Sequence, residues 1–200
     1  MAQASQTLRE VTGMGFDYAG LKDSALIMVD CQNTYRHGVM QLTNIEPAIL
    51  EAKKLLEMAR DLNVPIIHIQ HDAGVGSPYD ITAEIGAIST EVAPKNGEDV
   101  IIKNYPNAFI ATDLEAKLKA LGIENVVLAG FMTHVCINST ARGAFNLGFK
   151  PAVVASACAT RSLIGANNKV IDAQTMHEAA LAAVRDIFAV VVDDVASLKI

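Results

Sequence analysis

Short apolar runs rich in β-branched residues alternate along the chain with longer segments in which apolar residues recur every three or four positions. The runs predict six strands, at 25–30, 65–70, 99–103, 125–131, 151–156 and 189–192. The longer patterns predict four helices, at about 45–62, 112–122, 135–147 and 169–187. We expect Asn44 to cap the first helix, and Thr112 with Glu115 to form a capping box on the second.

This alternation, with its short connections, predicts a three-layer α/β/α fold around a mainly parallel, Rossmann-like sheet of about six strands. No linker or repeat interrupts the pattern, so we expect one domain over residues 21–200. Residues 1–20 are expected to form an arm that packs on the domain or on a partner subunit. In such sheets, ligands bind beyond the carboxyl ends of the strands.

The composition narrows the class of protein. The chain is 51% hydrophobic and 19% charged, which is typical of parallel strands buried on both faces. Its net charge of −6 predicts no nucleic-acid or anionic-membrane surface, and no apolar run approaches the ~18 residues of a membrane span. An odd count of three cysteines without a signal-peptide pattern indicates reduced thiols and a cytoplasmic location.

Three chemically capable residues lie at predicted strand ends or just beyond one: Asp30, Lys103 and Cys136. A thiol in the first turn of a helix lies near unpaired N–H groups and the positive end of the dipole, which favours the thiolate. Taken singly, each residue has a plainer interpretation: a turn aspartate, an edge lysine and a small buried thiol. Together they supply a base, a cation and a nucleophile, the groups needed for covalent acyl transfer.

Over residues 25–192 the chain resembles the isochorismatase-like cysteine hydrolases, a family that includes nicotinamidases and other small-amide hydrolases. Three blocks carry the resemblance: Asp30-Cys31-Gln32-Asn33; Lys103 with Asn107-Ala108-Phe109 and Thr112-Asp113-Leu114; and Gly130–Cys136 continuing through Thr140-Ala141-Arg142 to Gly148-Phe149. The resemblance implies that Asp30, Lys103 and Cys136 are a catalytic triad. It also implies a cis peptide between Phe131 and Met132, with the N–H groups of Met132 and Cys136 forming an oxyanion hole.

The activity that the resemblance implies is hydrolysis of a C–N bond in a small-molecule amide through a thioester, without a cofactor. Candidate substrate-binding residues are Gln32, Tyr35, Tyr105, Phe131, Thr133 and His134. The D-x-H metal motif of nicotinamidases is missing, with only His71-Asp72 in that stretch, so we expect no metal. True isochorismatases cleave a vinyl ether and lack the cysteine, so Cys136 argues against that reaction. Ser156-Ala157-Cys158 replaces the family's Asp-Ala pair, which weakens any carried-over role for that loop.

Two alternative hypotheses assign the chain to other classes of protein. A nucleotide-binding module would need G-x-G-x-x-G after the first strand, where the sequence reads VDCQNTYRHG. A catalytically silent scaffold or oligomerisation protein could keep the fold, but the intact Asp-Lys-Cys set disfavours it. We expect a homodimer or homotetramer whose neighbouring subunit helps to close the pocket. His68 is expected to be a buried, hydrogen-bonded histidine, and His177 to pack rather than react.

Overall fold

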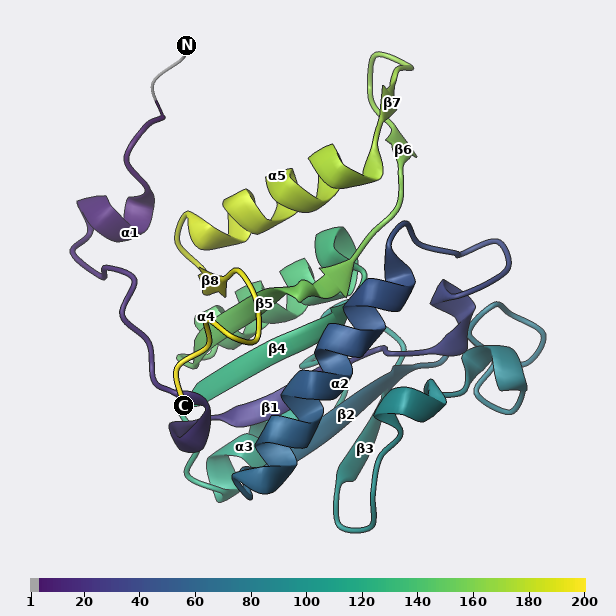
Figure 1. Ribbon diagram of the computed structural model, residues 1–200, viewed down its shortest axis with the longest axis horizontal. Helices are drawn as coiled ribbons and strands as arrows, with labels where there is room; N and C mark the ends of the chain where they lie inside the picture. Colours follow the sequence, from purple (N-terminus) through teal and green to yellow (C-terminus); the bar gives the residue numbers. More distant parts are fainter. Residues whose placement is uncertain (1–3) are drawn as a thin grey trace.

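The computed structural model describes residues 4–200 and contains a six-stranded sheet between two layers of helices (Figure 1). The strands are β1 (Ala25–Val29), β2 (Ile66–His71), β3 (Asp99–Lys103), β4 (Asn125–Phe131), β5 (Lys150–Ala159) and β8 (Val190–Val192). They lie in the order β3-β2-β1-β4-β5-β8, and every neighbouring pair is parallel. The predicted three-layer fold is therefore confirmed.

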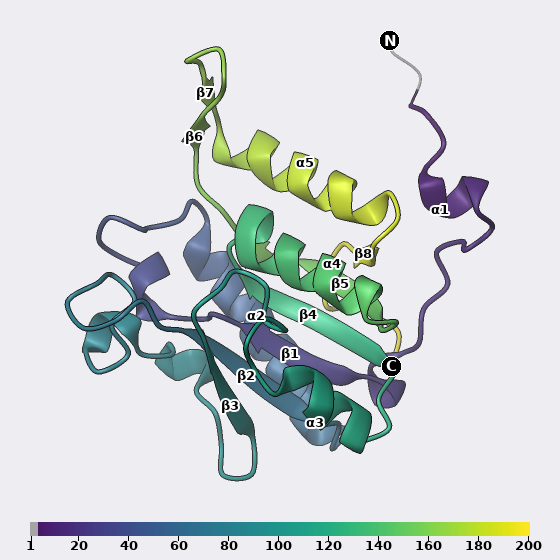
Figure 2. The ribbon, with the colours of Figure 1, turned by 180° about the vertical axis from the view of Figure 1, so that it is seen from behind.

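The two faces of the sheet bury different helices. On one face, α2 (Ile45–Asp61) packs with a stripe of buried residues, namely Ile45, Ala48, Ile49, Ala52, Leu55, Leu56 and Ala59. On the other face lie α3 (Leu114–Ala120), α4 (Asn138–Asn146) and α5 (Ala173–Arg185) (Figure 2). Every residue of β1 is buried, because helices cover both sides of this central strand.

The direction in which successive strands are added reverses between β1 and β4. From β1 the sheet continues through β2 to β3 on one side, and from β4 through β5 to β8 on the other. Loops leaving adjacent strands to opposite sides open a crevice at such a switch point. Gly130 permits the close pairing there, because its φ is 125° and a Cβ would lie 1.9 Å from the carbonyl oxygen of Val29.

The chain between β5 and α5 differs from the prediction. β5 runs on to Ala159, and a small antiparallel hairpin of β6 (Leu163–Ile164) and β7 (Val170–Ile171) follows. Helix α5 begins at Ala173 rather than Lys169, because Asp172 is the cap and its carboxylate accepts the Thr175 N–H at 2.9 Å.

Two predicted helix caps also differ. Asn44 occupies the cap position of α2, but in a left-handed conformation and without a side-chain capping bond. The capping box on α3 does not form, because Asp113 stands at the cap position and the Thr112 hydroxyl oxygen accepts the Leu114 N–H, at 3.4 Å, rather than the Glu115 N–H.

The predicted arm packs on its own domain through the short helix α1 (Leu8–Val11). The Arg9 N–H donates to the carbonyl of Asp186, and its guanidinium donates to the carbonyls of Gly15 and Ile187. Residues 1–3 of the arm lie outside the described residues, and the boundary at residue 20 stays a prediction. Within residues 4–200, no helix has the length and hydropathy needed to cross a membrane.

Candidate active site

Asp30 leaves the end of β1 with a φ of 50°, in the left-handed region that aspartate tolerates better than most residues. Its N–H donates to the carbonyl of Ile69 at 2.9 Å, and its carbonyl accepts the N–H of Gln32 at 2.8 Å. The tight turn thus stays attached to β2 while the Asp30 side chain is completely buried.

Gln32 holds the ends of neighbouring segments together. Its amide nitrogen donates to the carbonyls of His71 and Gly86, at 2.9 and 2.7 Å, and its amide oxygen accepts the His71 N–H at 2.9 Å. Both N–H bonds of this buried amide are used within the protein, so the structure places Gln32 as a support for the end of β2.

Lys103 reaches the switch point from β3, two strands away from β1. Its Nζ lies 2.7 Å from Asp30 Oδ2, 3.1 Å from His71 Nδ1 and 3.5 Å from Cys136 Sγ. The contacts with His71 and Cys136 are hydrogen bonds, and the contact with Asp30 is an ion pair. The structure therefore brings Asp30, Lys103 and Cys136 together in one buried cluster.

Cys136 lies in a π-helical turn, Thr133–Ile137, that follows a cis Phe131–Met132 peptide and leads into α4. The helix that the sequence predicted over 135–147 is present, but its path begins two residues earlier and its first turn is π-helical. The Ile137 N–H donates to the carbonyl of Met132 at 3.2 Å, closing that turn. Isolated π turns within helices are frequent at functional sites.

The loop that follows Lys103 is attached to the helix that follows Cys136. The Ala108 N–H donates to the Thr140 hydroxyl at 3.1 Å. Gly143 lets α4 approach this loop, since a Cβ there would lie 2.5 Å from the side chain of Asn107. These contacts explain why two of the sequence blocks occur together: they fix the lysine strand against the cysteine helix.

The electrostatics of the cluster differ from the sequence expectation. Burial and the negative charge of Asp30 raise the pKa of Cys136 to about 12, against the opposing effect of Lys103. Burial and the Asp30 charge therefore oppose the preference for the thiolate that the helix start was expected to give. Burial also raises the pKa of Asp30, opposed by Lys103. Although Lys103 lies at ion-pair distance, neither Asp30 oxygen accepts a hydrogen bond of regular geometry within residues 4–200.

The other residues that were predicted to bind substrate differ in burial and in the groups that they contact. Phe131 and Tyr35 are buried, with their ring centroids 5.8 Å apart in an edge-on arrangement. Thr133 is buried and its hydroxyl lies 2.9 Å from His177 Nδ1, while His134 Nδ1 lies 2.5 Å from the hydroxyl of Thr160.

Tyr105 lies outside the buried cluster. It is 53% exposed and belongs to the loop that follows β3. His68 is the buried, hydrogen-bonded histidine that the sequence predicted, with Nε2 2.8 Å from Glu98 Oε2.

The contact of His71 with Lys103 was not predicted from the sequence, in which His71 was considered only as a metal ligand. It is the register partner of Lys103 in the β2–β3 pair, and its ring packs edge-on against Tyr79 with centroids 5.0 Å apart. Burial and the charge of Lys103 lower the pKa of His71 to about 4, so the neutral ring can accept from the ammonium. The position of His71 at the end of β2 is the feature of the sequence that could have indicated this contact. Within residues 4–200, no three His, Cys, Asp or Glu side chains are grouped to hold a metal.

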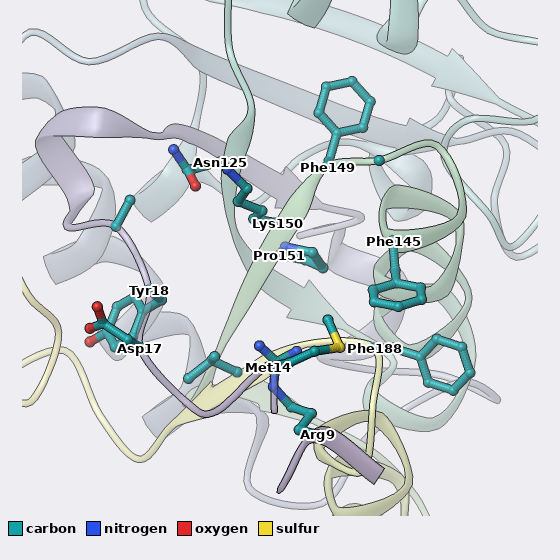
Figure 3. Close-up of a pocket in the computed structure, with 13 residues that line it drawn as sticks. Arg9, Met14, Asp17, Tyr18, Asn125, Phe145, Phe149, Lys150, Pro151 and Phe188 are labelled. Carbon is teal, nitrogen blue, oxygen red and sulfur yellow. The ribbon is translucent and has the colours of Figure 1, made fainter. Parts of the chain in front are cut away.

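A cavity of about 670 Å³ lies at the amino ends of β4 and β5 (Figure 3), whereas Cys136 follows the carboxyl end of β4. Its walls include the arm residues Met14 and Tyr18 and the first residues of β4 and β5, Asn125 and Lys150. A smaller cavity of about 100 Å³ lies beside the nucleophile turn, next to Thr160 and His177. Cys136 lines neither of these cavities and is 5% exposed. The candidate site is therefore defined by the cluster of Asp30, Lys103 and Cys136 rather than by a cavity.

The fold and this cluster define a doubly wound α/β protein with a candidate cysteine nucleophile at its switch point. The isochorismatase domain model matches residues 24–194, and the chain belongs to the isochorismatase family of hydrolases. It is 33% identical to a secreted isochorismatase effector of Verticillium dahliae, covering 93% of this chain and 96% of that protein. The crystal structure of an isochorismatase from Pseudomonas putida, 34% identical, superposes with a TM-score of 0.93, covering 98% of this chain and 100% of that one.

Amidohydrolases are also among the relatives. A maleamate amidohydrolase of Pseudomonas putida is 32% identical over 65% of this chain and 69% of its own length. A ureidoacrylate amidohydrolase of Stutzerimonas stutzeri is 29% identical over 68% of this chain and 69% of its own length. The predicted family is therefore confirmed, and it contains hydrolases of C–N bonds.

Proposed function

We propose that the protein is a cysteine-dependent hydrolase of a small-molecule amide, in which Asp30, Lys103 and Cys136 act as a triad. One observation carries the proposal: Lys103 Nζ contacts both Asp30 Oδ2 and Cys136 Sγ in a cluster shielded from solvent. The amidohydrolase relatives support the C–N bond as the target. No cofactor is needed for this chemistry.

In the first half of the proposed reaction, Asp30 accepts the thiol proton of Cys136 as the sulfur attacks the carbonyl carbon of the amide. A C–S bond forms, and the carbonyl π electrons move onto oxygen. The N–H groups of Met132 and Cys136 stabilise this oxyanion. The intermediate collapses, the C–N bond breaks, and protonated Asp30 transfers its proton to the leaving nitrogen.

In the second half, water attacks the thioester carbonyl while Asp30 accepts one of its protons. The C–S bond then breaks, the acid leaves, and the proton on Asp30 returns to the Cys136 sulfur. Lys103 offsets the negative charge as it passes between carboxylate and sulfur. In this proposal the proton leaves the thiol as the substrate carbonyl is attacked, which is consistent with the raised pKa of Cys136.

Ammonia release from a panel of carboxamides tests the proposal, with wild type compared against Cys136→Ala. Cys158→Ala is the matched control, because Cys158 is also a buried free thiol and is not in contact with Lys103. Loss of activity in the first variant and its retention in the second are expected. Activity that survives Cys136→Ala overturns the mechanism, and a folded wild type inactive on every amide supports the silent scaffold.

The homodimer or homotetramer is likewise a proposal. Val39 and Val75, in the loops after β1 and β2, are 81% and 86% exposed near the carboxyl edge of the sheet, which supports a neighbouring subunit there. Sedimentation of wild type and of a Val39→Ser/Val75→Ser variant tests it, with a shift towards monomer expected in the variant. A wild-type monomer overturns it.

A further inference from the structure

The larger cavity, at the amino ends of β4 and β5, is enclosed between the arm and the domain (Figure 3). Arg9, Met14 and Tyr18 of the arm form one part of its wall, and Asn125 and Lys150, the first residues of β4 and β5, form another. Its volume of about 670 Å³ lies within the range of about 300–1,000 Å³ that is typical of small-molecule sites. The space therefore suits a small organic ligand.

Aromatic side chains supply much of the apolar wall. Phe145 of α4 and Phe188, which precedes β8, lie edge-on with ring centroids 5.5 Å apart (Figure 3). Phe149, in the turn before β5, also lines the cavity, and its ring is stacked on that of Phe109 with centroids 5.7 Å apart. Because aromatic rings stabilise one another in edge-on and offset-stacked arrangements, this wall favours a planar aromatic ligand.

Arg9 gives the cavity a positive charge that no carboxylate within residues 4–200 neutralises. Its side chain is only 8% exposed, and it donates to the carbonyl of Gly15 from Nε at 2.7 Å and to that of Ile187 from Nη1 at 3.0 Å. In the same range Nη2 has no acceptor, and the ion pairs of arginine are formed by Arg36 and Arg60. A partly desolvated cation with unused N–H bonds favours an anion beside it.

The other charged residues that line the cavity are already paired at its rim. Lys150 Nζ lies 2.9 Å from Glu124 Oε2, and the Asp17 carboxylate contacts the ammonium group of Lys199. All four of these side chains are more than half exposed, so water and salt screen their charges. Arg9 therefore determines which sign of charge the cavity prefers.

We propose that this cavity binds a small aromatic carboxylate, with its rings against Phe145 and Phe188 and its carboxylate on the guanidinium of Arg9. The site lies at the amino ends of the strands, away from Cys136, and it goes beyond the proposed hydrolysis without depending on it. Because Arg9 and Met14 belong to the arm, the bound ligand also holds the arm on the domain. It should slow hydrogen exchange of the backbone amides of residues 8–19.

Calorimetric titration of the full chain with 2-naphthoate and with the neutral 2-naphthalenemethanol tests the preference for an anion. Wild type is expected to bind one 2-naphthoate per chain, at least about 10-fold more tightly than the alcohol. Arg9→Met should weaken binding of 2-naphthoate about 10-fold or more and change that of the alcohol by less than about 3-fold. Lys22→Met is the matched control for the loss of one charge, because Lys22 is exposed and lies in the short turn before β1.

Further variants separate the charge of Arg9 from docking of the arm and locate the probe. Arg185→Met removes another arginine that contacts the arm, 4.1 Å from the Phe16 ring, but leaves the cavity wall unchanged, so both affinities should stay within about 2-fold of wild type. Phe145→Leu changes the domain side of the cavity and should weaken both probes about 2- to 10-fold. Cys136→Ala should bind both as wild type does.

The inference is overturned if neither probe binds, as when a second copy of the chain fills the cavity, or if the alcohol binds as tightly as 2-naphthoate. It is equally overturned if Arg9→Met or Phe145→Leu leaves binding of 2-naphthoate unchanged, or if Arg185→Met weakens it as much as Arg9→Met does. Loss of binding in Cys136→Ala would place the probe at the catalytic cluster instead. Hydrogen exchange of residues 8–19 that 2-naphthoate does not slow would also contradict a site beneath the arm.

Discussion

Lys103 and Asp30 form an ion pair with a 2.7 Å contact between Nζ and Oδ2, and neither side chain is exposed to solvent. Removing two charges from water costs free energy that their mutual attraction often does not recover, so such a pair is weak evidence for stability. Cys136 Sγ lies 3.5 Å from the same Nζ. A costly pair beside a thiol is better explained by chemistry than by folding.

Lys103→Met should separate the contribution of this ion pair to stability from its contribution to catalysis. It leaves the Asp30 carboxylate buried and unpaired, so we expect the free energy of unfolding to fall by about 3–5 kcal/mol and amide hydrolysis to be lost. Asp30→Asn/Lys103→Met removes both charges and should regain most of that stability while remaining inactive. Urea unfolding and ammonia release measure the two quantities.

An exposed ion pair provides the control. Lys150 Nζ lies 2.9 Å from Glu124 Oε2, and both side chains are about two-thirds exposed or more. Lys150→Met should therefore change the free energy of unfolding by no more than about 1 kcal/mol. A similar effect of Lys103→Met and Lys150→Met on stability would contradict the assignment of Asp30–Lys103 as a coupled buried pair.

Asp30→Asn is expected to change thiol reactivity and turnover in opposite directions. The Asp30 charge helps to raise the pKa of Cys136, whereas Lys103 lowers it. Without the carboxylate, alkylation of Cys136 by iodoacetamide at pH 8 should be about 10-fold faster or more, while hydrolysis is lost because the base is missing. Peptide mass spectrometry follows the label.

Cys158 serves as the internal standard in that experiment. This thiol is buried, and burial raises its pKa without a contribution from Asp30. Its labelling should remain slow in wild type and in Asp30→Asn. Unchanged labelling of Cys136 would show that the carboxylate does not control its protonation.

The meeting of Asp30, Lys103 and Cys136 could be predicted because it needs only strand ends and parallel direction. The carboxyl ends of parallel strands lie at one edge, whatever the details of packing. The contact of Lys103 with His71 needs more, since it depends on the register of β2 against β3. One residue of slip would turn the histidine to the other face of the sheet.

The pKa of Cys136 could not be predicted from local sequence either. A helix-start argument considers only the backbone near the sulfur, whereas the burial that raises this pKa most arises from segments distant in the chain. The late start of α5 has a similar origin. The strands β6 and β7 have two residues each, which is too short to produce a periodic signal, so the sequence pattern predicts a helix start at Lys169 instead.

His71 should make stability depend on pH in the acid range. Its folded-state pKa is about 4, below the ~6.5 of an unfolded histidine, so between these values the unfolded chain binds the extra proton. The stabilising contribution is complete above pH 6.5 and is lost as the pH falls towards 4. Because the ring is only half-buried, we expect a loss of roughly 1–2 kcal/mol from this residue.

Urea unfolding of wild type and His71→Gln at pH 7 and pH 4.5 checks this expectation. Glutamine keeps an acceptor for Lys103 but does not titrate, so its stability should fall less between the two pH values. His68 is present in both proteins and its contribution cancels in the comparison. Equal losses in the two proteins would show that His71 does not carry the effect.

Gly130→Ala should disrupt the pairing of β1 with β4, on which the position of Asp30 relative to Cys136 depends. The added Cβ would lie 1.9 Å from the Val29 carbonyl oxygen, and φ is 125°, so the backbone must move. We expect a loss of at least about 3 kcal/mol in the free energy of unfolding. Gly97→Ala is the control, because Gly97 has a φ of 93° but no atom within 4 Å of its Cβ position, and about 1 kcal/mol is expected there. If the two variants are equally stable by urea unfolding, conformational freedom rather than close strand approach accounts for the glycine at position 130.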